Sequence, residues 1–303
     1  MANSRIFGTR EDGWVVTAHE LKSELGFRAV ILNHGATLQA FYLPNGRNVV
    51  LGYDDWSSYE TDANCTGSII GRNANRIANA SFKNGNQTYG LLANDGPHNL
   101  HSGPDGFDTQ IWDVEEIDNG LELRHSSPDG QNGFPGEVDV RLIILLRENI
   151  LRLEMEGVTS KPTPLNLTWH PYWNLSIRQR IDGHDLQVQA DARTELQTRD
   201  PIRVKDTRQD FRLGYPLGSI QLDENYANVA NTELVTDGNK LRVTSSLPDM
   251  QIYTGDGLPS PRAGIALEPQ FRPNDINLEQ NCLLKPGRVY RHWIEYAFDV
   301  PKA

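Results

Sequence analysis

Four stretches of the sequence combine titratable, amide and aromatic side chains that could carry out proton-transfer chemistry. They are GRNANRIANASF (71–82), HNLHSGPDGFD (98–108), LTWHPYWNL (167–175) and GIALEPQFRPNDINL (264–278). A histidine titrates near neutral pH, and the pKa of a partly buried carboxyl group can rise toward it, so His170 and Glu268 form a natural acid–base pair. Each stretch alone also fits a simpler explanation, such as a solvated loop, a packing cluster or a salt-bridged glutamate at a strand end.

The residues around this pair are suited to a sugar. Aromatic side chains offer flat apolar surfaces to the C–H faces of a sugar ring, and Arg, Asn, Gln and Asp form hydrogen bonds with its hydroxyl groups. The sequence contains no Gly-x-Ser-x-Gly nucleophile elbow, no dinucleotide fingerprint and no P-loop. These patterns favour proton transfer without a cofactor.

A metal site is not expected. His98 and His101 lie three residues apart, but no carboxylate or cysteine pattern near them completes a ligand set. Cys65 and Cys282 are far apart in the chain and have no metal-binding spacing, so neither a zinc site nor a disulfide scaffold is predicted.

The elements that must position these residues are predicted to be strands. Residues 151–157 alternate apolar and charged side chains, as in a half-buried strand, and 140–149 reads as a more deeply buried strand ending in a polar turn. The same interpretation applies to 185–191, 240–246, 250–255 and 288–298. No amphipathic helix of three turns or more is predicted. The economical fold class is all-β, a large antiparallel β-sandwich, with function on loops or on one face of a sheet.

Composition narrows the class of protein further. The 303 residues include 38% hydrophobic and 23% charged residues, which suits a globular chain with a substantial core. The net charge of -11 argues against a nucleic-acid partner. The sequence shows neither an apolar signal core nor a run long enough to span a membrane, so a cytoplasmic protein without a membrane partner is expected.

The four stretches, in this order along the chain, resemble motifs of the aldose 1-epimerase (galactose mutarotase-like) family. GRNANRIANASF is similar to Gly-Arg-x-Ala-Asn-Arg-Ile, and NLHSGPDGFD to Asn/Ser-Leu-His-Gly-Gly…Gly-Phe-Asp. LTWHPYWNL is similar to Leu-Thr-Asn-His-Ser-Tyr-Phe-Asn-Leu, and LEPQFRPND to Leu-Glu-Thr-Gln-x-x-Pro-Asp. LDENYAN (222–228) is a less distinctive match to an aspartate-bearing loop. The resemblance covers nearly the whole chain and implies one domain over 1–303 with the galactose mutarotase-like supersandwich fold.

The resemblance also implies a reaction, the interconversion of the α and β anomers of a free aldose without a cofactor. Glu268 would be the general base that removes the C1 hydroxyl proton, and His170 the general acid that protonates the ring oxygen. The remaining implied roles are those of sugar-binding residues, with hydrogen bonds from His101, Arg76 and Asn75, further hydroxyl contacts from Asp223, and Gln270 lining the same cleft. The expected partner is a small-molecule monosaccharide, bound by a monomer or a homodimer.

Departures from the family motifs concern the substrate. Trp169 stands where the family has Asn, Trp173 where it has Phe, and Pro171 and Pro269 also differ, while the proton-transfer residues are kept. We therefore expect Trp169 and Trp173 to form a pocket wall of altered shape. Tyr172 and Asn174 are expected to support His170.

Three alternatives remain open on the sequence. Arg262 and Arg272, near the relevant segments, could serve a phosphorylated or sulfonated sugar. A carbohydrate-binding or sugar-sensing protein could keep the cleft without catalysis. A structural β-sandwich with incidental polar loops would need no site at all.

Overall fold

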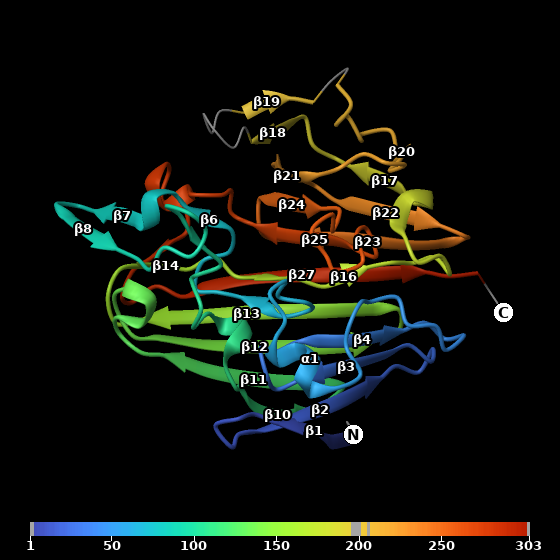
Figure 1. Ribbon diagram of the computed structural model, residues 1–303, viewed down its shortest axis with the longest axis horizontal. Helices are drawn as coiled ribbons and strands as arrows, with labels where there is room; N and C mark the ends of the chain where they lie inside the picture. The colour runs from blue at the N-terminus through green and yellow to red at the C-terminus, as the bar shows by residue number, and fades with distance from the viewer. Residues whose placement is uncertain (1–2, 195–200, 205–206, 302–303) are drawn as a thin grey trace.

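The computed structural model describes residues 3–194, 201–204 and 207–301, and the regular secondary structure of this part of the chain is almost entirely antiparallel strand (Figure 1). Its one α-helix, α1 (Trp56–Glu60), is five residues long and is capped by the side chain of Asp55, which accepts a hydrogen bond from the Ser58 N–H. The all-β prediction is confirmed. None of the helices in the described ranges is long and apolar enough to cross a membrane.

The largest layer is a nine-stranded antiparallel sheet. In spatial order its strands are β10 (Asp113–Ile117), β11 (Gly120–Ser127), β12 (Val138–Arg147), β13 (Ile150–Thr159), β27 (Tyr290–Asp299), β23 (Asn239–Ser245), β22 (Thr232–Thr236), β17 (Asp185–Val188) and β20 (Tyr215–Pro216). These strands include 151–157, 185–188, 240–245 and 290–298 of the predicted set. The strand at 140–149 is less buried than expected, because its side chains alternate between buried and half-exposed positions just as those of β13 do.

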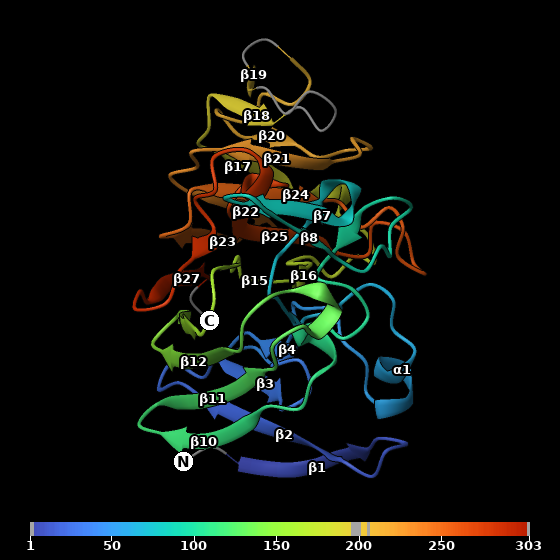
Figure 2. The same cartoon turned by 90° about the vertical axis from the view of Figure 1, so that its left-hand side faces the viewer.

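Two further sheets lie against the nine-stranded sheet. The four-stranded sheet consists of β1 (Asn3–Thr9), β2 (Val15–Lys22), β3 (Arg28–Leu32) and β4 (Leu38–Tyr42). The six-stranded sheet has the order β16 (Tyr172–Trp173), β25 (Ile265–Gln270), β24 (Asp249–Tyr253), β21 (Asp223–Ala227), β18 (Ala192–Thr194) and β19 (Pro201–Arg203). One hydrophobic cluster joins Leu142 and Ile294 of the large sheet to Phe41 and Leu267 of the other two, so the main core lies between the layers (Figure 2).

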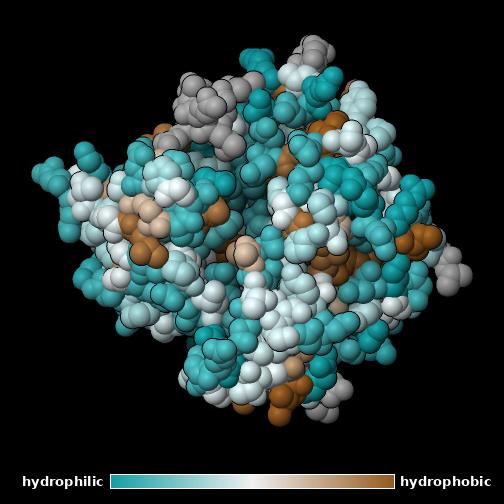
Figure 3. All heavy atoms as spheres, in the orientation of Figure 1, coloured by the Kyte–Doolittle hydropathy of each residue, from teal (hydrophilic) through white to brown (hydrophobic). Residues whose placement is uncertain are grey.

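Short strand pairs and turns complete the chain. The pairs are β5 (Ile69–Ile70) with β15 (Thr168–Trp169), β6 (Arg76–Ile77) with β9 (Asn99–Leu100), β7 (Ser81–Asn84) with β8 (Gln87–Gly90), and β14 (Thr163–Pro164) with β26 (Leu283–Leu284). Short 3₁₀ turns lie at Ala78–Ala80, Phe107–Thr109, Gln131–Gly133, Ile181–Gly183 and Asp275–Asn277. The face seen in Figure 3 is largely hydrophilic and is hollowed near its centre, over β24 and β25 of Figure 1.

Candidate active site

A cavity of about 230 Å³ brings together most of the residues that the sequence singled out. His170, Glu268, His101, Arg76, Asn75 and Asp223 all line it. The remaining lining residues are Ala63, Asn64, Cys65, Leu100, Tyr172, Gln251 and Tyr253. The site thus combines two histidines, two carboxyl groups, one arginine and three side-chain amides.

Strand pairing places His170 opposite Glu268. Tyr172 on β16 pairs with Ala266 on β25, and the antiparallel register, continued by two residues in each strand, puts His170 beside Glu268 on the same face. Pro171 has no N–H to donate to the ladder, and the backbone of His170 instead exchanges hydrogen bonds with the loop before β5, donating to Ser68 O and accepting from Gly67 N. The resulting distance from His170 Nε2 to Glu268 Oε1 is 3.4 Å.

Burial governs the protonation of this pair. Both side chains are almost completely buried, and burial disfavours whichever form is charged. It raises the pKa of Glu268 well above its usual value, with the negative charge of Asp223 as a second cause, and it lowers the pKa of His170 to about 4. Between the pKa values of the two groups the pair holds one proton, and burial favours the form in which that proton is on Glu268 and His170 is neutral.

His101 is held as a neutral hydrogen-bond donor. Its Nδ1 accepts a hydrogen bond from the backbone N–H of Asn75, at 3.2 Å, so the ring proton lies on Nε2. Burial, with the charges of His170 and Arg76 as further causes, lowers the pKa of His101 to about 3. The His101 ring meets the His170 ring edge to face, with centroids 5.8 Å apart.

Arg76 and Asn75 enter the cavity from the start of β6. Arg76 pairs in the ladder with Leu100, and its Nε donates to Asp95 Oδ2 at 2.6 Å, which fixes the guanidinium at the cavity edge. Asn75 has a left-handed backbone (φ 61°), and its Oδ1 accepts a hydrogen bond from the Arg76 N–H. Asn is among the residues that tolerate this conformation, which explains its place at a tight turn in the loop.

The floor of the cavity is formed by three neighbouring strands. Gln251 on β24 lies directly opposite Glu268 on β25, and its Nε2 donates to Asp223 Oδ1 on β21 at 2.6 Å. Tyr253, on the same face as Gln251, lies opposite Asp223. The sequence interpretation missed Gln251 and Tyr253, although the predicted strand 250–255 alternates them with buried apolar residues and so indicates a shared face.

The tryptophans do not lie where the sequence interpretation placed them. Trp169 and Trp173 have no exposed surface and belong to the hydrophobic core, with Trp173 packed against Phe41 and Tyr296. Neither lines the cavity, because both point to the face of the sheet opposite to that of His170. The expectation of an altered pocket wall is corrected to a packing role behind the site.

Gln270 and Asn174 also lie outside the cavity lining. Gln270 is fully buried beyond Glu268 on β25. Asn174 donates to the backbone oxygens of Arg178 and Ala263 and does not contact His170, whereas Tyr172 does support it, with ring centroids 4.9 Å apart.

The two arginines considered for an anionic sugar form ion pairs outside the candidate cavity. Arg262 is buried and pairs with Asp182, and it also donates to the backbone oxygens of Ile220 and Gly218. Arg272 pairs with Glu279 beside a different cavity. Within the described ranges no three His, Cys, Asp or Glu side chains gather as a metal site, and Arg76 is the cationic residue that lines the candidate cavity.

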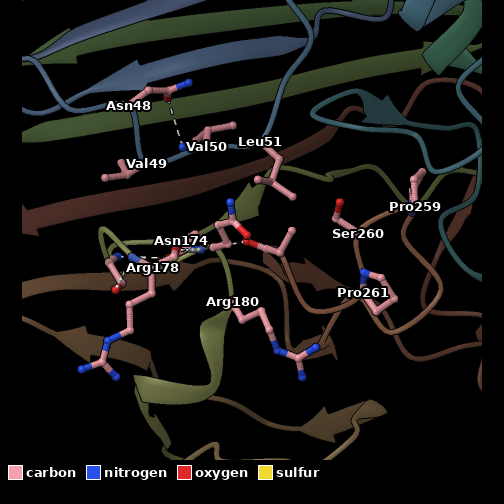
Figure 4. A pocket seen from close by; sticks show the side chains of 13 residues that line it. Asn48, Val49, Val50, Leu51, Asn174, Arg178, Arg180, Pro259, Ser260 and Pro261 are labelled. Atoms are coloured by element: carbon pink, nitrogen blue, oxygen red, sulfur yellow. Dashed lines mark hydrogen bonds between the residues drawn. The ribbon is translucent and has the colours of Figure 1, made fainter.

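A second and larger cavity, of about 650 Å³, lacks this chemistry. It is bordered by residues 48–51, by Asn174, Ser176 and residues 178–180, and by the loop around Pro259 to Pro261 (Figure 4). Its titratable lining residues are Arg178 and Arg180, and Arg180 is paired with Asp182. No acid–base pair lies there, so the smaller cavity is the candidate active site.

A large antiparallel β fold with a buried histidine–glutamate pair in a polar cavity fits the class of carbohydrate isomerases. The chain belongs to the aldose 1-epimerase family, whose model matches residues 17–297. Galactose mutarotase of Homo sapiens is 32% identical over 97% of this chain and 98% of its own length. Aldose 1-epimerase of Escherichia coli K12 is 30% identical over 95% of this chain and 96% of its own length.

Solved structures agree with this assignment. Galactose 1-epimerase from Lactobacillus acidophilus superposes with a TM-score of 0.91 at 26% identity, covering 99% of this chain and 98% of that one. An aldose epimerase homologue from C. elegans gives a TM-score of 0.87 at 27% identity, covering 93% and 98%. The comparisons favour neither an anionic-sugar enzyme nor a non-catalytic binder.

Proposed function

We propose that the protein interconverts the anomers of a free aldose, with Glu268 and His170 exchanging protons with the sugar. The observation that carries this proposal is the buried pair itself, with Nε2 and Oε1 3.4 Å apart at the bottom of a cavity lined by hydroxyl-binding groups. A protein that only binds sugar has no need for two buried groups of shifted pKa at one point.

The reaction needs one base and one acid, and the pair provides both. Glu268 removes the proton from the C1 hydroxyl while His170 protonates the ring oxygen, so the C1–O5 bond breaks and an open-chain aldehyde forms. Rotation about C1–C2 presents the other face of the carbonyl, and ring closure returns both protons. No net proton is consumed, which fits a pair that shares one proton in the resting state.

The other lining groups would hold the sugar during these steps. His101 offers a donor at Nε2, Arg76 a fixed cation, and Asp223 an acceptor oriented by Gln251. Their contacts with ring oxygen and hydroxyl groups would keep the aldehyde bound while it rotates. Asn75, which also lines the cavity, belongs to the same proposed set.

The identity of the aldose is tested by polarimetry. Freshly dissolved α anomers of a panel of hexoses and pentoses, with and without the protein, report any acceleration of mutarotation. Acceleration for at least one free sugar is expected, and slower or absent acceleration for phosphorylated and sulfonated sugars. Saturable binding of sugars in calorimetry with no acceleration for any of them would contradict the proposal.

The single domain, the cytoplasmic location and the monomeric or homodimeric state stay predictions.

A further inference from the structure

One carboxyl oxygen of Glu268, the proposed base, lacks a hydrogen-bond partner among the described residues. Glu268 Oε1 faces His170, but Oε2 is buried without a hydrogen-bond partner among the described residues. A carboxylate that must be ionised during the reaction needs hydrogen-bond donors, because an unpaired buried charge is strongly disfavoured. A donor for Oε2 should therefore lie close by.

The nearest side chains on either flank are already engaged. Gln251, directly across the ladder, uses its Nε2 on Asp223. The Tyr172 hydroxyl donates to the backbone oxygen of Asn64, at 3.2 Å. The tyrosine hydroxyl therefore has no donor left, and the second N–H of Gln251 Nε2 makes no hydrogen bond to Glu268 Oε2, which has no partner among the described residues.

Gln270 is the neighbour whose donors are free. It lies two residues after Glu268 on β25, hence on the same face, and it has no exposed surface. Both Nε2 and Oε1 of its amide are without a partner in the described part of the chain. Fully buried amides are almost always hydrogen-bonded, so two free atoms beside a free carboxylate oxygen call for an explanation.

Thr168 stands on the other side of this amide. The register that places His170 opposite Glu268 places Thr168 opposite Gln270, while Asp249 faces Gln270 from β24. The Thr168 hydroxyl is fully buried and has no partner among the described residues. A hydroxyl, an amide and a carboxylate thus lie in adjacent positions with complementary free donors and acceptors.

We propose that Gln270 is a positioning residue that donates from Nε2 to Glu268 Oε2 when this carboxyl group is ionised, while the Thr168 hydroxyl donates to Gln270 Oε1. The amide would then favour the form of the pair in which the proton is on His170. The inference rests on the proposed function for the role of Glu268 and adds a residue that does not line the cavity.

The other groups that face Glu268 do not replace this donor. Asp223 on β21 is an acceptor, and it repels the ionised form. Cys65, Tyr172 and Tyr296 all have their pKa values raised by burial and are neutral. The Tyr296 hydroxyl is also unpaired within the described ranges and makes no hydrogen bond to Glu268, and its ring packs on Trp169 and Trp173 in the core. Within the described ranges, His170 is the basic side chain paired with Glu268, at 3.4 Å.

The test compares three variants of the full chain. Gln270→Met keeps the length of the side chain and removes both polar atoms, and Thr168→Val removes only the hydroxyl. Gln39→Met is the matched control, because Gln39 is a buried glutamine on β4 whose amide donates to the backbone oxygen of Tyr53, away from the cavity. The readouts are the ¹³C carboxyl signal of Glu268 against pH, assigned by its loss in Glu268→Gln, and kcat and KM from polarimetry.

Gln270→Met is expected to move the titration midpoint of Glu268 upward by about one unit or more, since a hydrogen bond to a charged group is lost. The kcat at neutral pH should fall about tenfold or more with KM unchanged. Thr168→Val should give a smaller shift in the same direction, and Gln39→Met none.

Three results would overturn the inference. They are an unchanged midpoint in Gln270→Met, an equal shift in Gln39→Met, or a rise in KM alone, which would mark a direct sugar contact. If Gln270→Met does not fold, Thr168→Val decides by the presence or absence of its shift. The carboxyl titration needs no sugar. A wild-type protein without mutarotase activity would therefore refute the proposed function, while the titration would still test the hydrogen bond from Gln270 to Glu268.

Discussion

His170 and Glu268 lie opposite each other just beyond the last backbone pair of β16 and β25, with His170 Nε2 and Glu268 Oε1 3.4 Å apart. Pro171 ends the ladder between β16 and β25 at this point, and the backbone of His170 bonds to the loop before β5. The proposed acid and the proposed base are therefore held by two different sets of backbone hydrogen bonds. The sheet fixes the backbone of Glu268, while the loop that also contributes Asn64 and Cys65 to the cavity fixes the backbone of His170.

Removing either member of the pair should abolish most of the activity. Glu268→Gln and His170→Asn each replace one proposed proton-transfer group by a neutral amide. General acids and bases contribute about 10² to 10⁴ in rate. Polarimetric rates of both variants and of the double variant should be similar, because the two groups act as a unit. A single variant that retains wild-type kcat would contradict the assignment of its residue.

The pH dependence of the activity should show a plateau through neutral pH. Burial lowers the pKa of His170 to about 4 and raises that of Glu268, so the pair keeps one proton between these limits. As the pH falls through about 4, a second proton is taken up and the base is lost, so kcat/KM should decline there. Initial rates across buffers of constant ionic strength test this, with circular dichroism at each pH to confirm that the protein is still folded. An acid limb near pH 6.5 would instead indicate an ordinary, exposed histidine.

The sequence predicts the fold, and the meeting of His170 and Glu268 in one cavity, better than it predicts the walls of the site. Alternation of apolar and polar residues is local, so β13, β23 and β24 could be found from their own residues. Which face of β15 and β16 meets the core depends on the register with β25, which no local pattern reveals. For that reason Trp169 and Trp173, adjacent to His170 and to Tyr172 in sequence, were expected in the pocket although they lie behind it. Gln251 was missed for the same reason, since its place beside Glu268 depends on strand pairing.

The core position of the tryptophans makes a stability prediction. Trp169→Phe removes volume and also the Nε1 donor of the hydrogen bond to Ala36 O, at 3.1 Å, which leaves a buried oxygen unpaired. Trp173→Phe removes the same volume, but its Nε1 has no partner among the described residues. Each substitution should lower the free energy of unfolding by about 1–3 kcal/mol. The loss should be about 1 kcal/mol larger for Trp169→Phe than for Trp173→Phe, because only Trp169→Phe breaks a hydrogen bond. Denaturant unfolding measures the difference, and an increase in KM as the main effect of either variant would point back to a pocket wall.

Buried histidines should make the protein sensitive to acid. Burial lowers the pKa of His34, His170 and His184 to about 4 and that of His101 to about 3, so all four are neutral in the folded state near pH 5. In the unfolded chain they take up protons below about 6.5, so stability is lost as the pH falls from there toward 4. Each could contribute on the order of 1–2 kcal/mol at pH 5. Denaturant unfolding at pH 7 and pH 5 should show this loss, and His184→Gln should reduce it. Asp108 and Asp249, whose pKa values burial raises to about 6, act in the opposite sense over this range, so the difference between His184→Gln and the wild type is the deciding measurement. An equal loss of stability in both would contradict the neutral state of the His184 ring.

The hydrogen bond between Gln251 and Asp223 should determine how tightly the sugar is held. Gln251 Nε2 lies 2.6 Å from Asp223 Oδ1, and this contact leaves the second oxygen of the carboxylate to accept from a sugar hydroxyl. Gln251→Met frees the carboxylate to rotate, and Asp223→Asn replaces one acceptor by a donor. Because hydrogen bonds to charged groups are worth about 1.5–3 kcal/mol, each variant should lower kcat/KM about ten- to hundredfold, mainly through KM. If Gln251 acts through Asp223, the double variant should be little worse than Asp223→Asn alone, since residues in one network are not additive. Fully additive losses would instead mean that Gln251 contacts the sugar independently of Asp223.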